Sequence, residues 1–513
     1  MSKDERSPLV ILGLDTGDPE FIRRWAQEGY LPTIASIMER GTWGRTSGPE
    51  LISEHGVWRS LFSGLSRSQH GYYYYRQLTP GSYDLEETVG PDIDAPPFWR
   101  HLRGQDVRVA TVDVPDTDPV PGLPGLQLAH WGTHNNWNPD RLRPASTPPE
   151  LLDEVQKRFG DQLVTREKHE SSFEEDCQIY QQVMRRVETK GAACRHILTQ
   201  ENFDLMVAVF GESHVANHQF WSHHPDNAAP STSENELTHA IRDVYQAVDQ
   251  EMGKLLDELP EDANVFVVSS VGMKDDYPIT GFTEAFLRKL GYQATPEADG
   301  LSLHPMDLAR QVIPESWRAE LSKRLLPRET REKLLAQQFR NGKDWSRTRA
   351  FSIPSPYTSF IRVNLRGREP EGIVEPGPEY RALLNELETE LKNITDPVTN
   401  EPAVTQVWRT KELFEGDVHD ALPDLFADWR PGRFMQRVVH PEAELTQDKP
   451  EFYRRSDHSA YGFVAGAGPD VGQSGQDGEF EVLDLAPTFL SLMDTSVPEE
   501  MSGEVLESFA RAE

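Results

Sequence analysis

Two histidines at helical spacing are the first residues in the chain whose types and positions suggest chemistry. His214 and His218 lie four positions apart in the segment GESHVANH. Imidazoles at this spacing project from the same side of a helical turn, an arrangement that can hold a zinc-like ion. The alternative is a pair of surface histidines, because His223 and His224 follow closely. By itself, His458 in the segment SDHS is typical of an ordinary loop histidine.

Polar residues follow three apolar runs of the sequence. Leu9–Leu14 precedes Asp15, Leu205–Phe210 precedes His214, and Val265–Val268 precedes a Ser-Ser-Val-Gly tetrapeptide. Runs without apolar–polar alternation are typical of strands that are buried on both faces. In open α/β sheets, ligands bind at the carboxyl ends of such strands. We therefore predict that these polar residues gather at one edge of a sheet.

Helical patterns alternate with the apolar runs. Asp18 before Pro19 predicts a capped helix over residues 19–28, and apolar side chains recur at helical spacing within 235–258. The sequence therefore predicts an α/β fold with a mostly parallel central sheet and helices on both faces.

Two stretches interrupt this alternation and indicate insertions. Residues 115–150 are rich in Pro, Asn, Gly and Trp, which predicts long loops, whereas 291–345 contain a charged helical sequence that predicts a helical cap. We therefore expect residues 1–290 and 346–513 to form the two parts of one core, separated by the cap.

The composition excludes some classes of partner. A net charge of −32, from 84 acidic and 52 basic residues, argues against binding to a nucleic-acid backbone or to an anionic membrane surface. The two cysteines cannot build a disulfide framework or a cysteine-based zinc site. The apolar run near the N-terminus is too short for a signal peptide or a membrane span. We expect a cytoplasmic protein.

Five blocks of the sequence are similar to those of a known family. VILGLDTGDPEFIRRWAQEGYLPTIASIMERGTWG resembles the opening of the type I phosphodiesterase/nucleotide pyrophosphatase members of the alkaline phosphatase superfamily. The resemblance continues in VWRSLFSGLSRSQHGYY, VFGESHVANHQFW, SDHSAYGFVAGAGP and VLDLAPTFLSLMDTSVPEEMSGEVL. It implies an alkaline-phosphatase-like fold and a hydrolase of phosphate mono- or diesters on a small molecule.

The resemblance also implies a metal site. In the family, one site uses an acid or His, a second His four residues later, and a late His; here these are His214, His218 and His458. Three neutral imidazoles suit zinc, with manganese or iron as alternatives.

The second metal site of the family is altered in this sequence. The early Asp is present as Asp15. Counting back ten residues from Gly64 places Glu54, with Ser53 beside it, where the family has its nucleophile. Ser270-Val271 replaces the Asp-His pair of an Asp-His-Gly-Met motif. Because Val cannot bind a metal and Ser is a weak ligand, we do not expect the standard two-metal arrangement.

Three hypotheses follow from this change. In the first, a single ion at the three-histidine site supports hydrolysis, with Glu54 as general base or added ligand and Ser53 as a substitute nucleophile. In the second, Asp15, Glu54, His55 and Glu212 form a remodelled second site. In the third, the chain has lost hydrolysis and binds a ligand or partner.

Three further residues are candidates for substrate binding. Arg59 follows Glu54 by little more than one helical turn and could pair with an anionic substrate, with Glu54 or with a surface charge. Trp131 and His134 belong to a polar and aromatic cluster that could line a ligand pocket or pack on itself.

Overall fold

The computed structural model describes residues 6–53, 55–133, 138, 140–161, 167–168, 170–227, 234–296, 326–450, 453–475 and 477–510. The chain divides into two compact units. The first contains Met1–Tyr73, Val89–Asp275 and Arg454–Glu513, and the second contains Tyr74–Thr88 and Asp276–Tyr453. All the histidines of the predicted metal site belong to the first unit.

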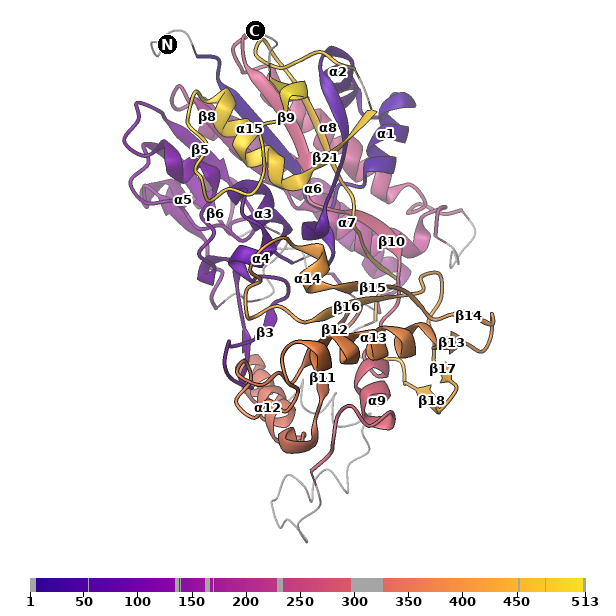
Figure 1. Ribbon diagram of the computed structural model, residues 1–513. Coiled ribbons are helices and arrows are strands. Elements are labelled where there is room, and N and C mark those ends of the chain that lie inside the picture. The colour runs from indigo at the N-terminus through magenta and orange to yellow at the C-terminus, as the bar shows by residue number, and fades with distance from the viewer. Residues whose placement is uncertain are drawn as a thin grey trace. The chain divides into compact units, whose positions relative to one another are not determined.

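A nine-stranded sheet forms the centre of the first unit, in the order β21-β2-β20-β9-β1-β8-β5-β6-β7 (Figure 1). The strands are β1 (Leu9–Leu14), β2 (Thr42–Ser47), β5 (Val109–Val112), β6 (Gly125–Ala129), β7 (Ala145–Thr147), β8 (Leu205–Phe210), β9 (Asn264–Ser269), β20 (Gly462–Ala467) and β21 (Asp477–Glu481). Strand β1 pairs in parallel with both β8 and β9, β5 pairs in parallel with β8 and β6, and β20 is antiparallel to β9 and β2. The sheet is thus mostly parallel, as predicted.

Helices cover both faces of this sheet. They are α1 (Pro19–Gln27), α2 (Pro32–Arg40), α3 (Val57–Ser63), α4 (Arg67–His70), α5 (Glu150–Phe159), α6 (Phe173–Leu198), α7 (Glu212–Phe220), α8 (Ala240–Leu256) and α15 (Leu485–Leu492). From β1, Val10, Leu12 and Leu14 pack with residues of α1, α2, α6 and α8. Leu9 and Ile11 pack on the other side with residues of α3 and α15. Alternate side chains of one strand therefore fill two cores, which explains its continuous apolar sequence.

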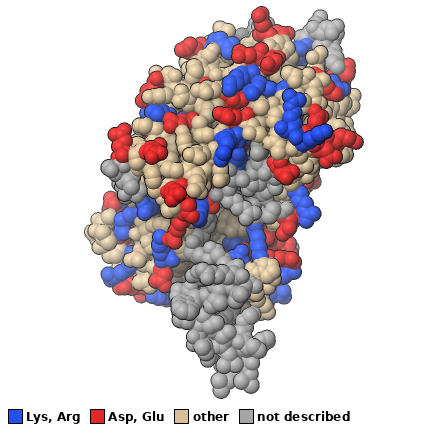
Figure 2. Space-filling view, turned by 180° about the vertical axis from the view of Figure 1, so that it is seen from behind, with Lys and Arg blue, Asp and Glu red and all other residues tan. Residues whose placement is uncertain are grey.

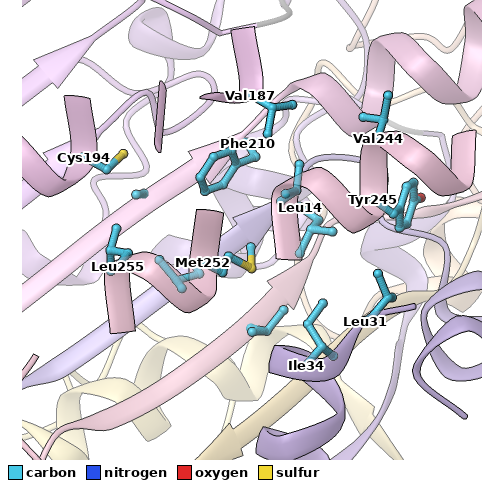
Figure 3. Close-up of a cluster of buried hydrophobic side chains, with 14 of the residues drawn as sticks. Leu14, Leu31, Ile34, Val187, Cys194, Phe210, Val244, Tyr245, Met252 and Leu255 are labelled. Carbon is cyan, nitrogen blue, oxygen red and sulfur yellow. The ribbon is translucent and has the colours of Figure 1, made fainter. Parts of the chain in front are cut away.

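The core on the α6 and α8 side lies directly behind the carboxyl end of β1. Figure 3 shows Leu14 in this cluster with Ile34 from α2, Val187 from α6 and Met252 from α8. Helix α1 begins as predicted, because the Asp18 carboxylate accepts hydrogen bonds from the backbone N–H groups of Glu20 and Phe21. The turn after β1 is therefore anchored by a packed core and a capped helix.

The segment 115–150 contains more regular structure than the long loops expected from its sequence. Strands β6 and β7 lie within it, and β6 extends the parallel sheet. Gln127 interrupts the apolar pattern of β6, but this side chain is buried and its amide exchanges hydrogen bonds of 2.8 and 2.9 Å with the backbone of Val120. A buried glutamine paired to backbone is compatible with a central strand, and composition alone does not reveal it.

The second unit contains two small antiparallel sheets, ordered β11-β12-β16-β15 and β14-β13-β17-β18, and a hairpin of β3 with β4. The strands are β3 (Arg76–Leu78), β4 (Leu85–Glu87), β11 (Ala350–Ile353), β12 (Ser359–Val363), β13 (Thr395–Asp396), β14 (Glu401–Pro402), β15 (Val404–Arg409), β16 (Leu425–Trp429), β17 (Arg437–His440) and β18 (Ala443–Thr446). Its helices include α9 (Phe282–Lys289), α12 (Arg328–Asn341), α13 (Pro378–Lys392) and α14 (Thr410–Leu413). Residues 297–325 of the expected cap lie outside the described residues, so the predicted boundaries at 290 and 345 remain a prediction.

The surface carries charges of both signs. On the face shown in Figure 2, Asp and Glu side chains are dispersed among Lys and Arg side chains rather than gathered in one patch. Many pair at the surface, as Arg45 does with Glu479 and Arg437 with Glu444. No helix among the described residues is long and apolar enough to cross a bilayer.

Candidate metal centre

The structure brings the three predicted histidines together. His214 and His218 lie on α7, which begins directly after β8, and His458 lies on β19 (Ser456–Ser459). Strand β19 pairs antiparallel with β10 (Gly272–Asp275), with His458 opposite Met273. One nitrogen from each of the three imidazoles can be chosen so that all lie within 4.8 Å of one another. The Nε2 atoms of His218 and His458 are 3.0 Å apart.

Each of these imidazoles has a polar partner at Nδ1. The partners are Thr16 Oγ1 at 2.9 Å from His214, Ser456 Oγ at 3.0 Å from His218 and Asp457 Oδ1 at 3.2 Å from His458. Metal-binding histidines usually have such a partner on the second ring nitrogen, because it fixes the ring and its tautomer. The arrangement fits an ion bound through Nε2. In a tetrahedral zinc site with bonds of 2.0–2.1 Å, the donor atoms lie about 3.4 Å apart.

The turn after β1 supplies the partner of His214 and is itself firmly held. Thr16 has a positive φ of 57°. Its carbonyl oxygen accepts hydrogen bonds from Asn217 Nδ2 at 2.6 Å and from the Tyr245 hydroxyl at 3.1 Å. Burial raises the pKa of Tyr245 well above its usual range, so this hydroxyl remains a donor. Helices α7 and α8 therefore fix the turn that orients His214.

Asp15 lies beside this group and is held by two other side chains. Its Oδ1 atom accepts hydrogen bonds from Trp58 Nε1 at 2.7 Å and from the Ser270 hydroxyl at 3.2 Å. Its Oδ2 atom is 3.7 Å from His214 Nδ1. This carboxylate can therefore stabilise positive charge on His214 from the side opposite Nε2.

The segment that replaces the family's Asp-His pair packs against the same turn. Ser270 Oγ accepts a hydrogen bond of 3.3 Å from the Thr16 backbone N–H, and Val271 is 2% exposed. A Cβ atom added at Gly272 would lie 2.6 Å from a carboxylate oxygen of Asp18, so the close packing here requires glycine. Among the described residues, the three histidines are the only group of three or more His, Cys, Asp or Glu side chains that could hold an ion.

Of the residues expected around the nucleophile position, Glu54 lies outside the described residues. Ser53 has a positive φ of 64°, and its hydroxyl donates a hydrogen bond of 3.0 Å to the carbonyl oxygen of Tyr73. The loop that contains Ser53 and His55 ends at α3, where Trp58 contacts Asp15. Ser53 therefore lies five residues before a side chain that contacts Asp15.

A buried charged pair beneath this loop was missed by the sequence analysis. The Arg67 guanidinium is fully buried and donates to the carbonyl oxygens of four loop residues, which are Glu50, Ile52, Ser53 and His55. The Glu50 carboxylate accepts from the Arg67 backbone N–H at 2.8 Å and from Ser66 Oγ at 2.9 Å. Burial raises the pKa of Glu50 and lowers that of Arg67 to about 10. Nothing in the sequence distinguishes Glu50 or Arg67 from a charged residue at the surface.

The other predicted auxiliary residues have contacts of their own. Glu212 is buried and its carboxylate pairs with Arg186 at 3.0 Å and with Lys190 at 3.8 Å. Trp131 is also buried, and its indole N–H donates to the carbonyl oxygen of Gly160 at 3.2 Å. The structure therefore shows ion pairs for Glu212, and core packing with one hydrogen bond for Trp131.

Arg59 is 6% exposed and donates to the carbonyl oxygen of Ala95 at 3.1 Å. It lines a cavity of about 350 Å³ together with Arg100 and Arg103. Burial lowers the pKa of Arg59. His134 lies outside the described residues. The substrate-binding roles of these residues stay predictions.

Two residues near the centre carry no signal in the sequence. Glu167 Oε1 lies 3.5 Å from Nε2 of His214, and the other carboxylate oxygen lies 3.3 Å from Arg454 Nη1. Glu167 stands in a charged stretch, TREKHE, that is typical of exposed chain, and Arg454 precedes β19 in a similar context. Only the folded chain places them beside the imidazoles.

The first unit thus has a mostly parallel sheet covered by helices on both faces, with two of the imidazoles on the helix after β8 and the third on β19. The family model described as type I phosphodiesterase / nucleotide pyrophosphatase matches residues 9–448. The chain belongs to this family, as the sequence blocks predicted, and is therefore a hydrolase of the phosphodiesterase type.

The chain is similar to solved structures at low sequence identity, and one with a TM-score above 0.5 has the same fold. Phosphonoacetate hydrolase from Sinorhizobium meliloti 1021, in complex with phosphonoformate, is 14% identical, with a TM-score of 0.51 over 95% of both chains. Human ectonucleotide pyrophosphatase / phosphodiesterase 5 (ENPP5) is 12% identical, with a TM-score of 0.48 over 96% of both chains. No curated protein sequence matches the chain.

Proposed function

We propose that this chain is a metal-dependent hydrolase of phosphate mono- or diesters on small molecules, with one ion held by His214, His218 and His458. The observation that carries the proposal is the common arrangement of the three rings. Each has a polar partner at Nδ1, and nitrogen atoms of all three converge within 4.8 Å. Zinc is the ion that three imidazoles suit best, with manganese or iron as alternatives.

The surroundings of Asp15 support one ion rather than two. The carboxylate accepts hydrogen bonds from Trp58 and Ser270, and Val271 supplies no donor atom. Both hydrogen bonds end on Oδ1, so a second ion would bind this carboxylate through Oδ2 and would have to find its remaining ligands near Ser53 and His55. In the remodelled second site that we considered from the sequence, Glu212 was an optional ligand, and its carboxylate pairs with Arg186 and Lys190.

Residues around the three histidines have separate roles in the proposed reaction. A bound zinc ion supplies Lewis acidity toward an ester oxygen or a water. Thr16 and Ser456 hold the rings of His214 and His218 in one orientation, and Asp15 balances positive charge on His214. We assign Glu54 as general base or added ligand and Ser53 as the candidate nucleophile, whose hydroxyl must leave its hydrogen bond to Tyr73 to react. We also place the protein in the cytoplasm, because Cys177 and Cys194 are both free thiols.

The test combines metal content with turnover. Purified protein is analysed for bound metal and assayed on a chromogenic phosphodiester with added zinc or manganese, beside the variant His214→Ala/His218→Ala/His458→Ala. The matched control is His239→Ala, which removes an exposed histidine outside the group.

We expect about one equivalent of metal and turnover in the wild type and the control, and neither in the triple variant. Turnover that is equal in the triple variant would overturn the proposal. Metal without turnover on any ester would instead favour a family member that only binds ligands.

A further inference from the structure

We propose that Glu167 is a fourth protein ligand of the ion at the three-histidine group, which then takes the water or ester oxygen as a fifth ligand. This inference rests on the proposed function. Its Oε1 atom is 3.5 Å from Nε2 of His214. Thr16 lies against the Nδ1 atom of the same ring, so Nε2 is the nitrogen that we assign to the ion. The carboxylate therefore approaches the ring at the atom where the ion would bind.

The 3.5 Å separation of these two atoms is informative. An N–H···O hydrogen bond normally measures 2.7–3.2 Å, so the contact is long for a direct bond. Two ligands of one tetrahedral zinc ion lie about 3.4 Å apart, which is close to the observed distance. Glu167 and His214 are therefore spaced as two donors to one ion.

Arg454 holds Glu167 in place through the second carboxylate oxygen. Its Nη1 atom is 3.3 Å from Glu167 Oε2, and its Nη2 atom is 3.5 Å from Asp457 Oδ1. The same Asp457 oxygen lies 3.2 Å from Nδ1 of His458. The Glu167 side chain is 18% exposed and that of Arg454 is 12% exposed, so both charges are largely withdrawn from water.

These contacts link the three histidines through charged side chains. From His214 the link passes through Glu167, Arg454 and Asp457 to His458, whose Nε2 atom faces that of His218. The guanidinium contacts two carboxylates and reaches Glu167 through Oε2, whereas Oε1 is the oxygen that approaches His214. One guanidinium thus orients both a histidine ligand and the carboxylate.

Charge gives a reason for a fourth ligand of this type. Three neutral imidazoles leave both positive charges of a divalent ion uncompensated, and one carboxylate cancels part of that charge. The atoms within 4.8 Å of one another include only the three histidines, so Glu167 must move closer to His218 and His458 when the ion binds. Rotation about its side-chain bonds can supply this movement.

The test measures metal binding rather than turnover. Glu167→Gln keeps the size of the side chain and removes its charge. We expect the zinc dissociation constant, from competition with a chromogenic chelator, to rise at least about 10-fold, the lower limit for loss of an outer-shell partner. The visible spectrum of the cobalt(II)-loaded protein should also change, because it reports the ligand set. The matched control is Glu174→Gln, the same change at an exposed residue of α6, which should alter neither quantity.

The outcomes separate this inference from the proposed function. If Glu167→Gln leaves the zinc affinity and the cobalt spectrum unchanged while His218→Ala abolishes binding, Glu167 is not a ligand and the three-histidine site stands. If His218→Ala binds zinc like the wild type, the proposed function fails. If Glu167→Gln does not fold, Glu167→Asp is the alternative variant, because it keeps the negative charge on a side chain that is one methylene group shorter. We expect it, too, to lower the zinc affinity and to change the cobalt(II) spectrum.

Discussion

The indole N–H of Trp58 donates a hydrogen bond of 2.7 Å to Oδ1 of Asp15. Asp15 is 2% exposed, and Ser270 donates to the same oxygen at 3.2 Å. The early aspartate of the family motif is therefore held by side chains from α3 and from the end of β9. A buried carboxylate depends on such donors, because it has lost the hydrogen bonds of water.

We expect Trp58→Phe to destabilise the protein mainly through Asp15. Phenylalanine retains an aromatic ring against Phe62, which stacks on Trp58 with centroids 5.5 Å apart, but it has no donor. Leaving a buried polar group short of a partner costs about 1–3 kcal/mol. Urea unfolding monitored by circular dichroism measures the difference.

Trp99→Phe is the matched control for this substitution. Trp99 is also fully buried in the same core, but its Nε1 atom has no hydrogen-bond partner among the described residues. The two variants lose the same atoms, so the cost of the smaller ring is common to both. Equal losses of stability in the two variants would contradict a special role for the bond to Asp15.

The substitution of two residues after β9 should create a second metal site. In Ser270→Asp/Val271→His, the Asp-His pair of the family motif returns beside Asp15. A second carboxylate next to Asp15 repels it, and a divalent ion between them removes the repulsion. We expect the double variant to bind two equivalents of zinc instead of one, and to unfold at a higher temperature with zinc than without it.

Ser270→Asn/Val271→Leu is the control for this gain, because it enlarges both side chains without adding a negative charge or an imidazole. It should bind one equivalent, like the wild type. A double variant that also binds only one equivalent would show that the 53–55 loop, and not the Ser-Val sequence alone, prevents a second ion from binding.

The sequence predicts this site in part, and the physical reasons for the limits differ. The residue types and spacing of His214 and His218 are local signals that the sequence displays directly. The third ligand, His458, is far away in the chain and could be predicted only from the resemblance to the family. The strands β1, β8 and β9 could be predicted because burial on both faces leaves a continuous apolar run. Glu167 could not, because a charged residue in a polar segment has the same local pattern whether it faces an ion or solvent.

The buried pair of Glu50 and Arg67 illustrates a second limit. Charged residues are rarely buried in proteins, so the sequence alone predicts that Glu50 and Arg67 lie at the surface. What buries Arg67 is a set of carbonyl oxygens in the turn between Glu50 and His55, and that turn exists only after the chain has folded. Prediction from sequence fails for Arg67 because its backbone partners are distant in the chain, whereas those of the Asp18 cap are two and three residues away.

Arg67→Met should be strongly destabilising and should disorder the loop that carries residue 54. Methionine fills much of the volume but leaves the loop carbonyl oxygens and the Glu50 carboxylate without the guanidinium. Leaving a buried acceptor without its donor costs about 1–3 kcal/mol, and the Arg67 guanidinium serves four carbonyl oxygens. Because His214, His218 and His458 do not contact Arg67 directly, we expect kcat on a phosphodiester to fall far more than zinc affinity.

Arg45→Met is the control for Arg67→Met. Arg45 pairs with Glu479 at the surface, with side chains 45% and 49% exposed, and such pairs contribute little. Both substitutions remove one arginine, so the change in net charge is the same. If Arg67→Met lowered kcat no more than Arg45→Met, the loop would not need this guanidinium for activity.

His224 should make the protein less stable as the pH falls. The ring is 4% exposed, packs against Phe21 and Trp221, and accepts a hydrogen bond of 3.2 Å at Nδ1 from the Asp226 backbone N–H. Burial lowers the pKa of His224 from 6.5 to about 4. The unfolded chain therefore binds a proton more readily than the folded one. The stability that the protein gains from keeping His224 neutral is fully present above pH 6.5 and is lost as the pH falls toward 4.

His224→Asn should reduce this dependence, because the amide offers an acceptor oxygen that does not titrate. Because the pKa of His224 is about 4 in the folded chain and 6.5 in the unfolded chain, this residue lowers the free energy of unfolding by about 2 kcal/mol between pH 8 and pH 5. Urea unfolding at both pH values, with a chelator present, gives the pH-dependent loss for the wild type, for His224→Asn and for the control His196→Asn, at a partly exposed histidine of α6. Lost packing lowers the stability of His224→Asn equally at both pH values and cancels in the difference. Between pH 8 and pH 5, the free energy of unfolding should fall by about 2 kcal/mol more in the wild type and the control than in His224→Asn. An equal fall in all three proteins would assign the acid sensitivity to other groups.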